Sequence, residues 1–227
     1  MKKFSLYLLS IITLTGFIAC EGNKVNETVG RLRMMNASYN SGGVNIDIDY
    51  KTAYDKYVEY LNYSLFRDLI AGKKHTIKIR QQSSGFSIDT NLVVEENRAY
   101  TIFLYDSMNN FKHKVVNEVF DVPKGSFCKI RFLHLSNDAP IVDVKRDGSA
   151  AVEFGHYENG MNSEYQTFES GNYFFRVNQA GTLNTIYTQQ PRDFKAGYFY
   201  TMYLKGNTGS TGTDSLGLFV VENNGDY

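Results

Sequence analysis

The chain has 227 residues, of which 42% are hydrophobic and 21% are charged, so it can bury a core and does not have the composition of a disordered chain. Its formal net charge is zero, which removes the electrostatic argument for a nucleic-acid partner. Aromatic residues make up 15% of the chain, and only three prolines are present. Short alternating runs rich in Tyr, Phe, Val, Ile and Thr favour β structure.

The first twenty residues form a targeting segment rather than part of the fold. Lys2 and Lys3 give a positive start, and residues 4–19 are apolar but too short to span a bilayer as a helix. The segment ends in FIAC, which resembles a bacterial lipobox. The resemblance implies a signal peptide over residues 1–19 and a palmitate-type lipid on Cys20. An ordinary secretory signal that happens to contain a cysteine is the alternative.

Lipidation of Cys20 would leave Cys128 without a partner for a disulfide bond. The chain contains only Cys20 and Cys128, so no intramolecular disulfide would remain. We expect Cys128 to be a buried, small apolar side chain, and a catalytic thiol is the sharper alternative. Removal of residues 1–19 takes away two lysines and leaves 22 basic against 24 acidic residues, a net charge of −2.

The remaining chain divides into a tether and a series of short strands. Residues 20–29 are mostly polar and predict a tether. Strict alternation over residues 44–50 places Val44, Ile46 and Ile48 on one face of a strand. The tyrosines of residues 54–61 fit either a helical turn or a strand, and we favour the strand. The predicted strands of this half are residues 31–36, 44–50, 54–61, 75–80, 86–94, 99–105 and 114–122.

The second half of the chain repeats the order of the first. The matched pairs are Arg33 with Arg131 and Ser38 with Ser136, 98 positions apart, and Tyr100-Thr101 with Tyr200-Thr201, 100 positions apart. The repeat predicts two tandem domains over residues 30–123 and 127–224, separated at Pro123-Lys124-Gly125-Ser126. A single large β-sandwich is the alternative. The second copy's predicted strands are residues 129–135, 141–146, 151–154, 165–168, 172–178, 183–188, 198–205 and 216–222.

Each copy therefore holds about seven short strands, the number that suits an immunoglobulin-like sandwich. The predicted fold class is all-β, with two tandem immunoglobulin-like β-sandwich domains.

One stretch of the second copy resembles a known family. Residues 130–144, IRFLHLSNDAPIVDV, resemble the opening motif of the domain-of-unknown-function family numbered 4397, and Ser170-Gly171-Asn172-Tyr173 resembles a later motif. In the first copy Asn36 stands at the position of His134, and Ser41-Gly42-Gly43 replaces the Asp-Ala-Pro turn. The resemblance covers residues 30–222. It implies β-sandwich modules in an exported bacterial envelope protein, but no activity.

The sequence offers little for catalysis or metal binding. The four histidines do not fall at metal-ligand spacings, and no Gly-x-Ser-x-Gly motif is present. His134 is expected to bond a backbone carbonyl near the Ser136 turn. Asp138, Asp143 and Asp147 lie close in sequence, but Asp138 belongs to a turn and Asp143 is expected to face solvent. We predict no enzyme activity, no cofactor and no metal.

Tyrosines are the remaining binding signal. Tyr54, Tyr57, Tyr60 and Tyr63 recur every three residues, and an exposed row of tyrosines could stack on sugar rings or anchor a partner. Burial in the core is the alternative. The candidate binding residues are Tyr57, Tyr60, His134 and Asp138.

These features together predict a non-catalytic lipoprotein of the bacterial cell envelope. Its partners would be the membrane, through the lipid on Cys20, and a glycan or an envelope protein bound by the two modules. We expect it on the outer membrane, facing the periplasm or the cell surface. A pilin-like assembly subunit that donates a strand, and an envelope hydrolase, are the alternatives.

Overall fold

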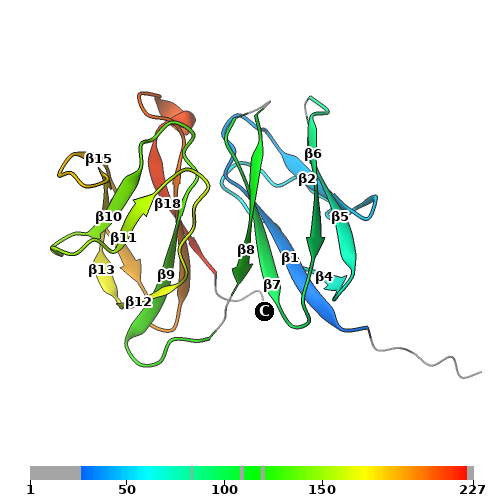
Figure 1. The fold of residues 1–227 in the computed structure, drawn as a ribbon, viewed down its shortest axis with the longest axis horizontal. Helices are drawn as coiled ribbons and strands as arrows, with labels where there is room; N and C mark the ends of the chain where they lie inside the picture. The colour runs from blue at the N-terminus through cyan, green and yellow to red at the C-terminus, as the bar shows by residue number, and fades with distance from the viewer. Residues whose placement is uncertain (1–26, 83, 108–109, 119–120, 224–227) are drawn as a thin grey trace, which may run out of the picture.

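The computed structural model describes residues 27–82, 84–107, 110–118 and 121–223. It consists of two β domains that lie side by side along the long axis of the molecule (Figure 1). The predicted signal peptide, Cys20 and the first part of the predicted tether lie outside the described residues. Among the residues described, no helix has the length and apolar character needed to cross a membrane.

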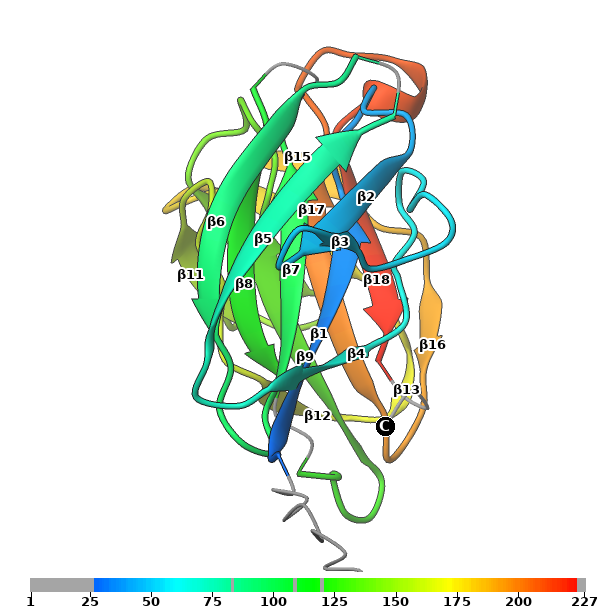
Figure 2. The same cartoon turned by 90° about the vertical axis from the view of Figure 1, so that its right-hand side faces the viewer.

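The first domain is a sandwich of two four-stranded sheets. The sheet that faces the other domain, called the inner sheet, has the order β4-β1-β7-β8, and the outer sheet has the order β3-β2-β5-β6 (Figure 2). The strands are β1 (Val29–Asn36), β2 (Val44–Ile48), β3 (Lys51–Thr52), β4 (Arg67–Ile70), β5 (Lys74–Gln81), β6 (Ser87–Val93), β7 (Ala99–Tyr105) and β8 (Lys112–Glu118).

The second domain repeats this arrangement. Its inner sheet has the order β12-β9-β17-β18, its outer sheet has the order β11-β10-β14-β15, and β13 pairs with β16 beside them. The strands are β9 (Phe127–His134), β10 (Val142–Arg146), β11 (Phe154–Tyr157), β12 (Gln166–Glu169), β13 (Gly171–Tyr173), β14 (Phe175–Gln179), β15 (Thr185–Thr188), β16 (Arg192–Phe194), β17 (Phe199–Lys205) and β18 (Gly217–Glu222).

The predicted fold class, all-β with two tandem immunoglobulin-like β-sandwich domains, is confirmed. The duplication extends to the register of the strands. β1 runs parallel to β7 with Arg33 opposite Thr101, and β9 runs parallel to β17 with Arg131 opposite Thr201. The predicted boundary at residues 123–126 lies between β8 and β9.

The strand expected at residues 54–61 is wrong. This segment is irregular, and Val58 forms only an isolated bridge with Val44. The amide of Asn36 donates to the Val58 carbonyl at 3.0 Å, and Leu61 has a positive φ of 63°. Side-chain bonds and a left-handed residue therefore hold the segment as a loop across the end of the sandwich.

Other strand predictions differ in their bounds. The strand expected at 114–122 is β8 and ends at Glu118, the strand expected at 151–154 lies at 154–157, and the strand expected at 172–178 is divided at Phe174. β4 was not predicted, because RDLI contains too few residues to display an alternation. The other predicted strands coincide with observed strands to within about two residues at each end, the usual uncertainty of such boundaries.

Three separate cores result from this arrangement. Each sandwich has its own core, in which Ile102 of β7 and Met202 of β17 are fully buried. The third core lies between the two inner sheets and includes Met35, Phe103 and Leu133. The inner strands are therefore covered on both faces, which explains why all seven residues of β7 are buried.

A buried polar cluster lies beside this third core. The guanidinium groups of Arg33 and Arg131 are 2% and 1% exposed, and both donate to Glu118 Oε1, at 3.3 and 2.6 Å. Each arginine Nε also donates to the hydroxyl of a threonine on the neighbouring strand, Thr101 at 2.9 Å and Thr201 at 2.8 Å. One carboxylate thus joins the two domains.

Asn223 and Tyr165 complete the cluster. Asn223 accepts from Arg33 at 2.8 Å and donates to the Tyr165 hydroxyl at 2.8 Å, and Tyr165 donates to Glu118 Oε2 at 3.1 Å. Burial raises the pKa of Glu118, but Arg131 and then Arg33 outweigh it and hold that pKa below its ordinary value. The carboxylate therefore stays ionised, and it offsets one of the two buried positive charges.

Candidate functional site

The stretch with the family motif forms the end of β9, a turn and the start of β10. His134 is fully buried, and its Nε2 lies 3.1 Å from the carbonyl of Pro140, so Nε2 carries the proton and donates. Burial lowers the pKa of His134 and favours this neutral ring. Ser136 donates to the Gly206 carbonyl at 2.6 Å, as Ser38 does to the Asp106 carbonyl at 2.7 Å. The stretch therefore fastens a loop in each domain and leaves His134 without contact to solvent.

Asp138 serves a neighbouring loop. Its two carboxylate oxygens accept from the backbone N–H and the hydroxyl of Thr208, both at 2.8 Å. The side chain stays at the surface, so a role in binding is a prediction that these bonds leave open. Because both carboxylate oxygens bond Thr208, Asp138 holds two loops together and does not have the geometry of an ion ligand.

The expectation that Asp143 faces solvent is wrong. Asp143 is 5% exposed, and its two oxygens accept the backbone N–H groups of His156 and Gly181, each at 2.8 Å. Alternation correctly placed it on the outer face of β10, but the neighbouring loops cover that end of the strand. Burial raises the pKa of Asp143, but these two bonds outweigh it, so the pKa lies below its ordinary value.

The four regularly spaced tyrosines do not form one exposed row. Tyr54 is buried in the first domain's core, and Tyr60 donates to the Thr213 carbonyl at 3.2 Å across the domain boundary. Tyr57 and Tyr63 are 38% and 42% exposed. They line a cleft of about 440 Å³ along the irregular segment, so Tyr57, one of the two tyrosines predicted to bind, faces an open cleft.

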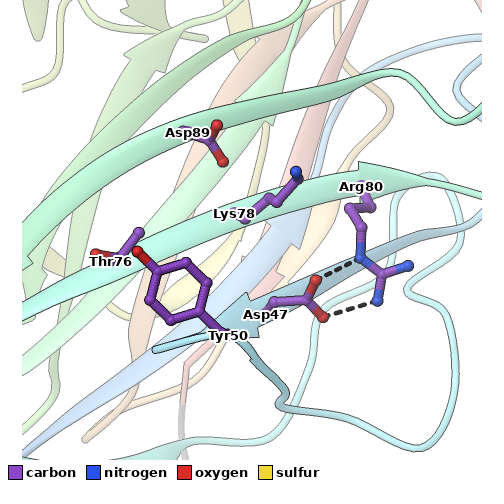
Figure 3. Close-up of a pocket in the computed structure, with 6 residues that line it drawn as sticks. All are labelled: Asp47, Tyr50, Thr76, Lys78, Arg80 and Asp89. Carbon is purple, nitrogen blue, oxygen red and sulfur yellow. Dashed lines mark hydrogen bonds and ion pairs between the residues drawn. The ribbon is translucent and has the colours of Figure 1, made fainter.

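A second cleft, which we call the outer-sheet cleft, lies on the outward face of β2 and β5 in the first domain (Figure 3). Its volume is about 390 Å³. Arg80 binds Asp47 through two hydrogen bonds, of 2.5 Å from Nε and 2.7 Å from a terminal nitrogen. The hydrogen bonds from Arg80 lower the pKa of Asp47 and burial raises it, and the net pKa lies below its ordinary value. The lining residues are Asp47, Tyr50, Thr76, Lys78, Arg80 and Asp89.

Tyr50 is the unusual member of this cleft. Its side chain is 90% exposed, and its backbone has a φ of 67°, a left-handed conformation that costs a tyrosine about 1 kcal/mol or more. The second domain carries Gly148 at the matching position, 98 residues later, with a φ of 77°. Glycine adopts this conformation without strain. The first domain thus keeps an aromatic ring where the turn itself favours glycine.

The turn that carries Tyr50 is held by the residue before it. Asp49 accepts from the Thr76 backbone N–H at 3.0 Å, lies 2.9 Å from His75 Nδ1 and forms an ion pair with Lys73 at 3.2 Å. Burial raises the pKa of Asp49, but these three partners outweigh it and hold the pKa at about 2. The backbone under the exposed ring is therefore fixed by a network of charge-assisted bonds.

Sequence reasoning missed the outer-sheet cleft. The alternation over residues 44–50 assigned Asp47 to the outward face, but it treated Tyr50 as the end of the strand. The repeat contained the signal, because aligning Tyr50 with Gly148 shows an aromatic residue in a glycine position. The pairing of Asp47 with Arg80 joins two strands and is visible only in the fold.

Cys128 and the metal-binding residue types form no site in the described part of the chain. Cys128 is fully buried, and burial raises the pKa of its thiol. Its sulfur lies 3.8 Å from the Tyr173 hydroxyl. Across residues 27–223, apart from the gaps named above, no three His, Cys, Asp or Glu side chains gather as a metal site would require.

The comparison with protein families matches both halves of the chain. The model described as Domain of unknown function (DUF4397) matches residues 30–145 and again residues 128–226. No curated protein matches the chain. The first match covers the first sandwich and extends into β9 and β10, and the second match covers the second sandwich, which agrees with the tandem arrangement predicted from the repeat. The chain therefore belongs to the DUF4397 family, and carries two copies of its domain.

Proposed function

We propose that this protein is a non-catalytic, lipid-anchored protein of the bacterial cell envelope that binds a hydroxyl-rich glycan in the outer-sheet cleft. The N-terminal sequence supports the anchor, because a positive start, an apolar stretch and FIAC occur in the order of a lipoprotein signal. The anchor would be the lipid on Cys20, in the outer membrane.

The strained, exposed ring of Tyr50 is the observation that carries the glycan proposal. A residue held in a left-handed conformation costs stability, and such strain is found at functional sites. Packing does not compensate the cost, because the side chain is 90% exposed. An aromatic ring offers a flat apolar face with a polar tip, which suits stacking on a sugar ring.

The polar groups of the cleft fit a ligand with hydroxyl groups. The pair of Asp47 with Arg80 holds both side chains in fixed positions. Lys78 and Asp89 stand opposite each other on β5 and β6 without an ion-pair contact within the described residues, so both can bond a ligand. Two carboxylates and two cations line the cleft, and their charges cancel, which favours a neutral sugar over an ionic ligand.

This cleft does not favour the hydrolase alternative. A hydrolase of the glycosidase type needs a carboxylic acid that keeps its proton, and Arg80 lowers the pKa of Asp47. Within the described residues, no observation favours the pilin-like alternative. Both stay predictions without a supporting contact.

A glycan array tests the proposal with the full-length protein in detergent. Wild type should bind neutral oligosaccharides, and Tyr50→Gly should weaken that binding about tenfold or more, equivalent to ~1.4 kcal/mol. Tyr50→Phe is the matched control, since it keeps the ring and should keep the binding. Equal binding by wild type and Tyr50→Gly would rule out this cleft.

The anchor has its own test. Mass spectrometry of the membrane fraction should find residues 1–19 removed and acyl chains on Cys20. Cys20→Ala should abolish both the acyl chains and the membrane association. An unmodified Cys20 in the mature protein would contradict the lipoprotein part of the proposal and leave the glycan part unaffected.

A further inference from the structure

The outer face of the second domain has a cleft at the same place as the first, with different charges. It has a volume of about 180 Å³ and lies over β10, β14 and β15. The two outer sheets are on opposite sides of the molecule (Figure 1). The cleft is lined by Lys145, Arg146, Asp147, Gly148, Ser149, Arg176, Asn178, Leu183 and Thr185.

A pair of like charges lies at the centre of this cleft. Lys145 stands directly opposite Arg176 in the register of β10 and β14. The first domain has Asp47 opposite Lys78 at the matching positions, 98 residues earlier. Opposite charges in such a pair stabilise a sheet and like charges destabilise it. The like-charge pair therefore destabilises the outer sheet of the second domain, whereas the matching pair stabilises that of the first.

The cations of the cleft are only partly compensated. Arg176 pairs with Asp147 at 2.6 Å, and Arg146 pairs with Glu153 at 3.6 Å. Lys145 has no carboxylate within ion-pair distance in the described part of the chain. Asp143 lies on the same face, but it is buried and its oxygens already accept two backbone N–H groups. The charged residues that line the cleft are three cations, Lys145, Arg146 and Arg176, and one carboxylate, Asp147, so its lining is positive.

The remaining lining residues match a sugar. Thr185 donates to Asn178 Oδ1 at 2.9 Å, and the amide of Asn178 also carries N–H donors. Leu183 is 87% exposed at the rim and offers an apolar surface to one face of a ring. Donor atoms, an apolar rim and a positive lining are complementary to a sugar that carries a carboxylate.

We propose that the second domain binds an acidic sugar, of the uronic acid class, whose carboxylate lies between Lys145 and Arg176. Lys145 and Arg176 supply the positive charge, and Leu183 at the rim supplies an apolar contact that a sugar ring uses and a free phosphate does not. This site is independent of the neutral-glycan site proposed for the first domain, and it makes the two faces of the molecule selective for different sugars.

Calorimetric titration of the full-length protein with trigalacturonate tests this site. Wild type should bind, and binding should weaken as salt is raised from about 0.05 to 0.5 M, because the carboxylate is screened. Lys145→Met should weaken binding about tenfold or more. Lys74→Met removes the same charge from an exposed position outside both clefts and should have no effect.

A second variant separates binding from folding. Lys145→Asp recreates the opposite-charge pair of the first domain, so it should melt at the same or a higher temperature than wild type and still lose trigalacturonate. The methyl ester of trigalacturonate should not bind this cleft. Three results would each overturn the proposal: no binding by wild type, equal loss in Lys145→Met and Lys74→Met, or tighter binding of inorganic phosphate than of the uronate. Tyr50→Gly should leave uronate binding unchanged, which distinguishes failure here from failure of the first site.

Discussion

The inner and outer sheets of this protein differ in how closely the two domains resemble each other. On the inner sheets Arg33 and Arg131 make the same bond to a threonine of the next strand. On the outer sheets Tyr50 stands where the other domain has Gly148. An inner strand is packed on both faces, so a change there disturbs two cores, whereas an outer face meets solvent. The outer faces are therefore where the two domains can acquire different ligands.

At one position of the inner sheets the two domains have different residues, and the contacts there explain the difference. Glu118 pairs with Ala99 at the end of β8, and Asn223 pairs with Phe199 at the equivalent place after β18. A second glutamate here would face the first across the interface. A single carboxylate already contacts both arginines, so asparagine suffices at the other position and adds the donor that Tyr165 accepts.

The largest expected effect comes from breaking this interface. Glu118→Gln leaves two buried guanidinium groups without a counter-charge, which should lower the free energy of unfolding by about 3–5 kcal/mol. Denaturant unfolding of the full-length protein measures it. Glu222→Gln is the control, because the ion pair of Glu222 with Lys195 is partly exposed and 4.0 Å long, so its loss should cost less than about 0.5 kcal/mol. Similar losses in the two variants would refute the bridging role of Glu118.

Ser38 and Ser136 make equivalent hydrogen bonds in the two domains. Replacing each serine tests whether the two bonds also contribute equally to stability. Ser38→Ala removes the donor to the Asp106 carbonyl, and Ser136→Ala removes the donor to the Gly206 carbonyl. Each substitution should lower the free energy of unfolding by about 1–2 kcal/mol. Thermal and denaturant unfolding should give the same loss for both. Values that differ by much more than the experimental error would show that only one of the loops needs its serine.

The Asp49 network predicts that acid weakens the first domain. The pKa of Asp49 is about 2 in the folded protein, below its ordinary value of 3.8. Stability from this carboxylate is fully present above pH 4 and is lost as the pH falls towards 2. The side chain is 34% exposed, so we expect a loss of only about 1 kcal/mol after solvent screening. Asp49→Asn should flatten this part of the pH profile, and a profile identical to wild type would contradict the assignment.

The smallest expected effect is the exchange of the two turn residues. Tyr50→Gly relieves the left-handed strain of the folded state but raises the conformational entropy of the unfolded chain. The two effects oppose each other, so the free energy of unfolding should change by less than about 1 kcal/mol. Gly148→Tyr places the strain in the second domain and should cost about 1 kcal/mol. Melting temperatures of the two variants check this. A large loss in Tyr50→Gly would show that Tyr50 is structural, and the glycan proposal would lose its basis.

Most of the fold could be predicted from local pattern. Alternation placed Ile77 and Ile79 inward on β5, and both are fully buried. The repeat identified two domains because Arg33 and Arg131 keep nearly the same spacing as the pairs that follow. The segment at 54–61 failed because its tyrosines suggested a period, whereas its conformation is set by the amide of Asn36, which lies far away in sequence.

The candidate sites could be predicted only in part. His134 attracted attention as a residue that can titrate, but its burial against Pro140 depends on how the turn folds back. The cluster around Glu118 joins residues as far apart as Arg33 and Asn223, and no local pattern records such contacts. Cys20 lies outside the described residues, so its lipidation stays a prediction.

The parallel pairing of β1 with β7 also determines how the molecule carries load. A pull on the N-terminus acts along the axis of β1, which lies between β4 and β7 in the inner sheet. The hydrogen bonds on both sides of the strand are then strained together in shear rather than opened one at a time. Force spectroscopy that pulls from residue 27 should therefore meet a higher resistance than pulling outward from β6 at the sheet edge. For the lipid anchor proposed at Cys20, this geometry would let the attachment point hold while flow drags a ligand bound at either proposed site.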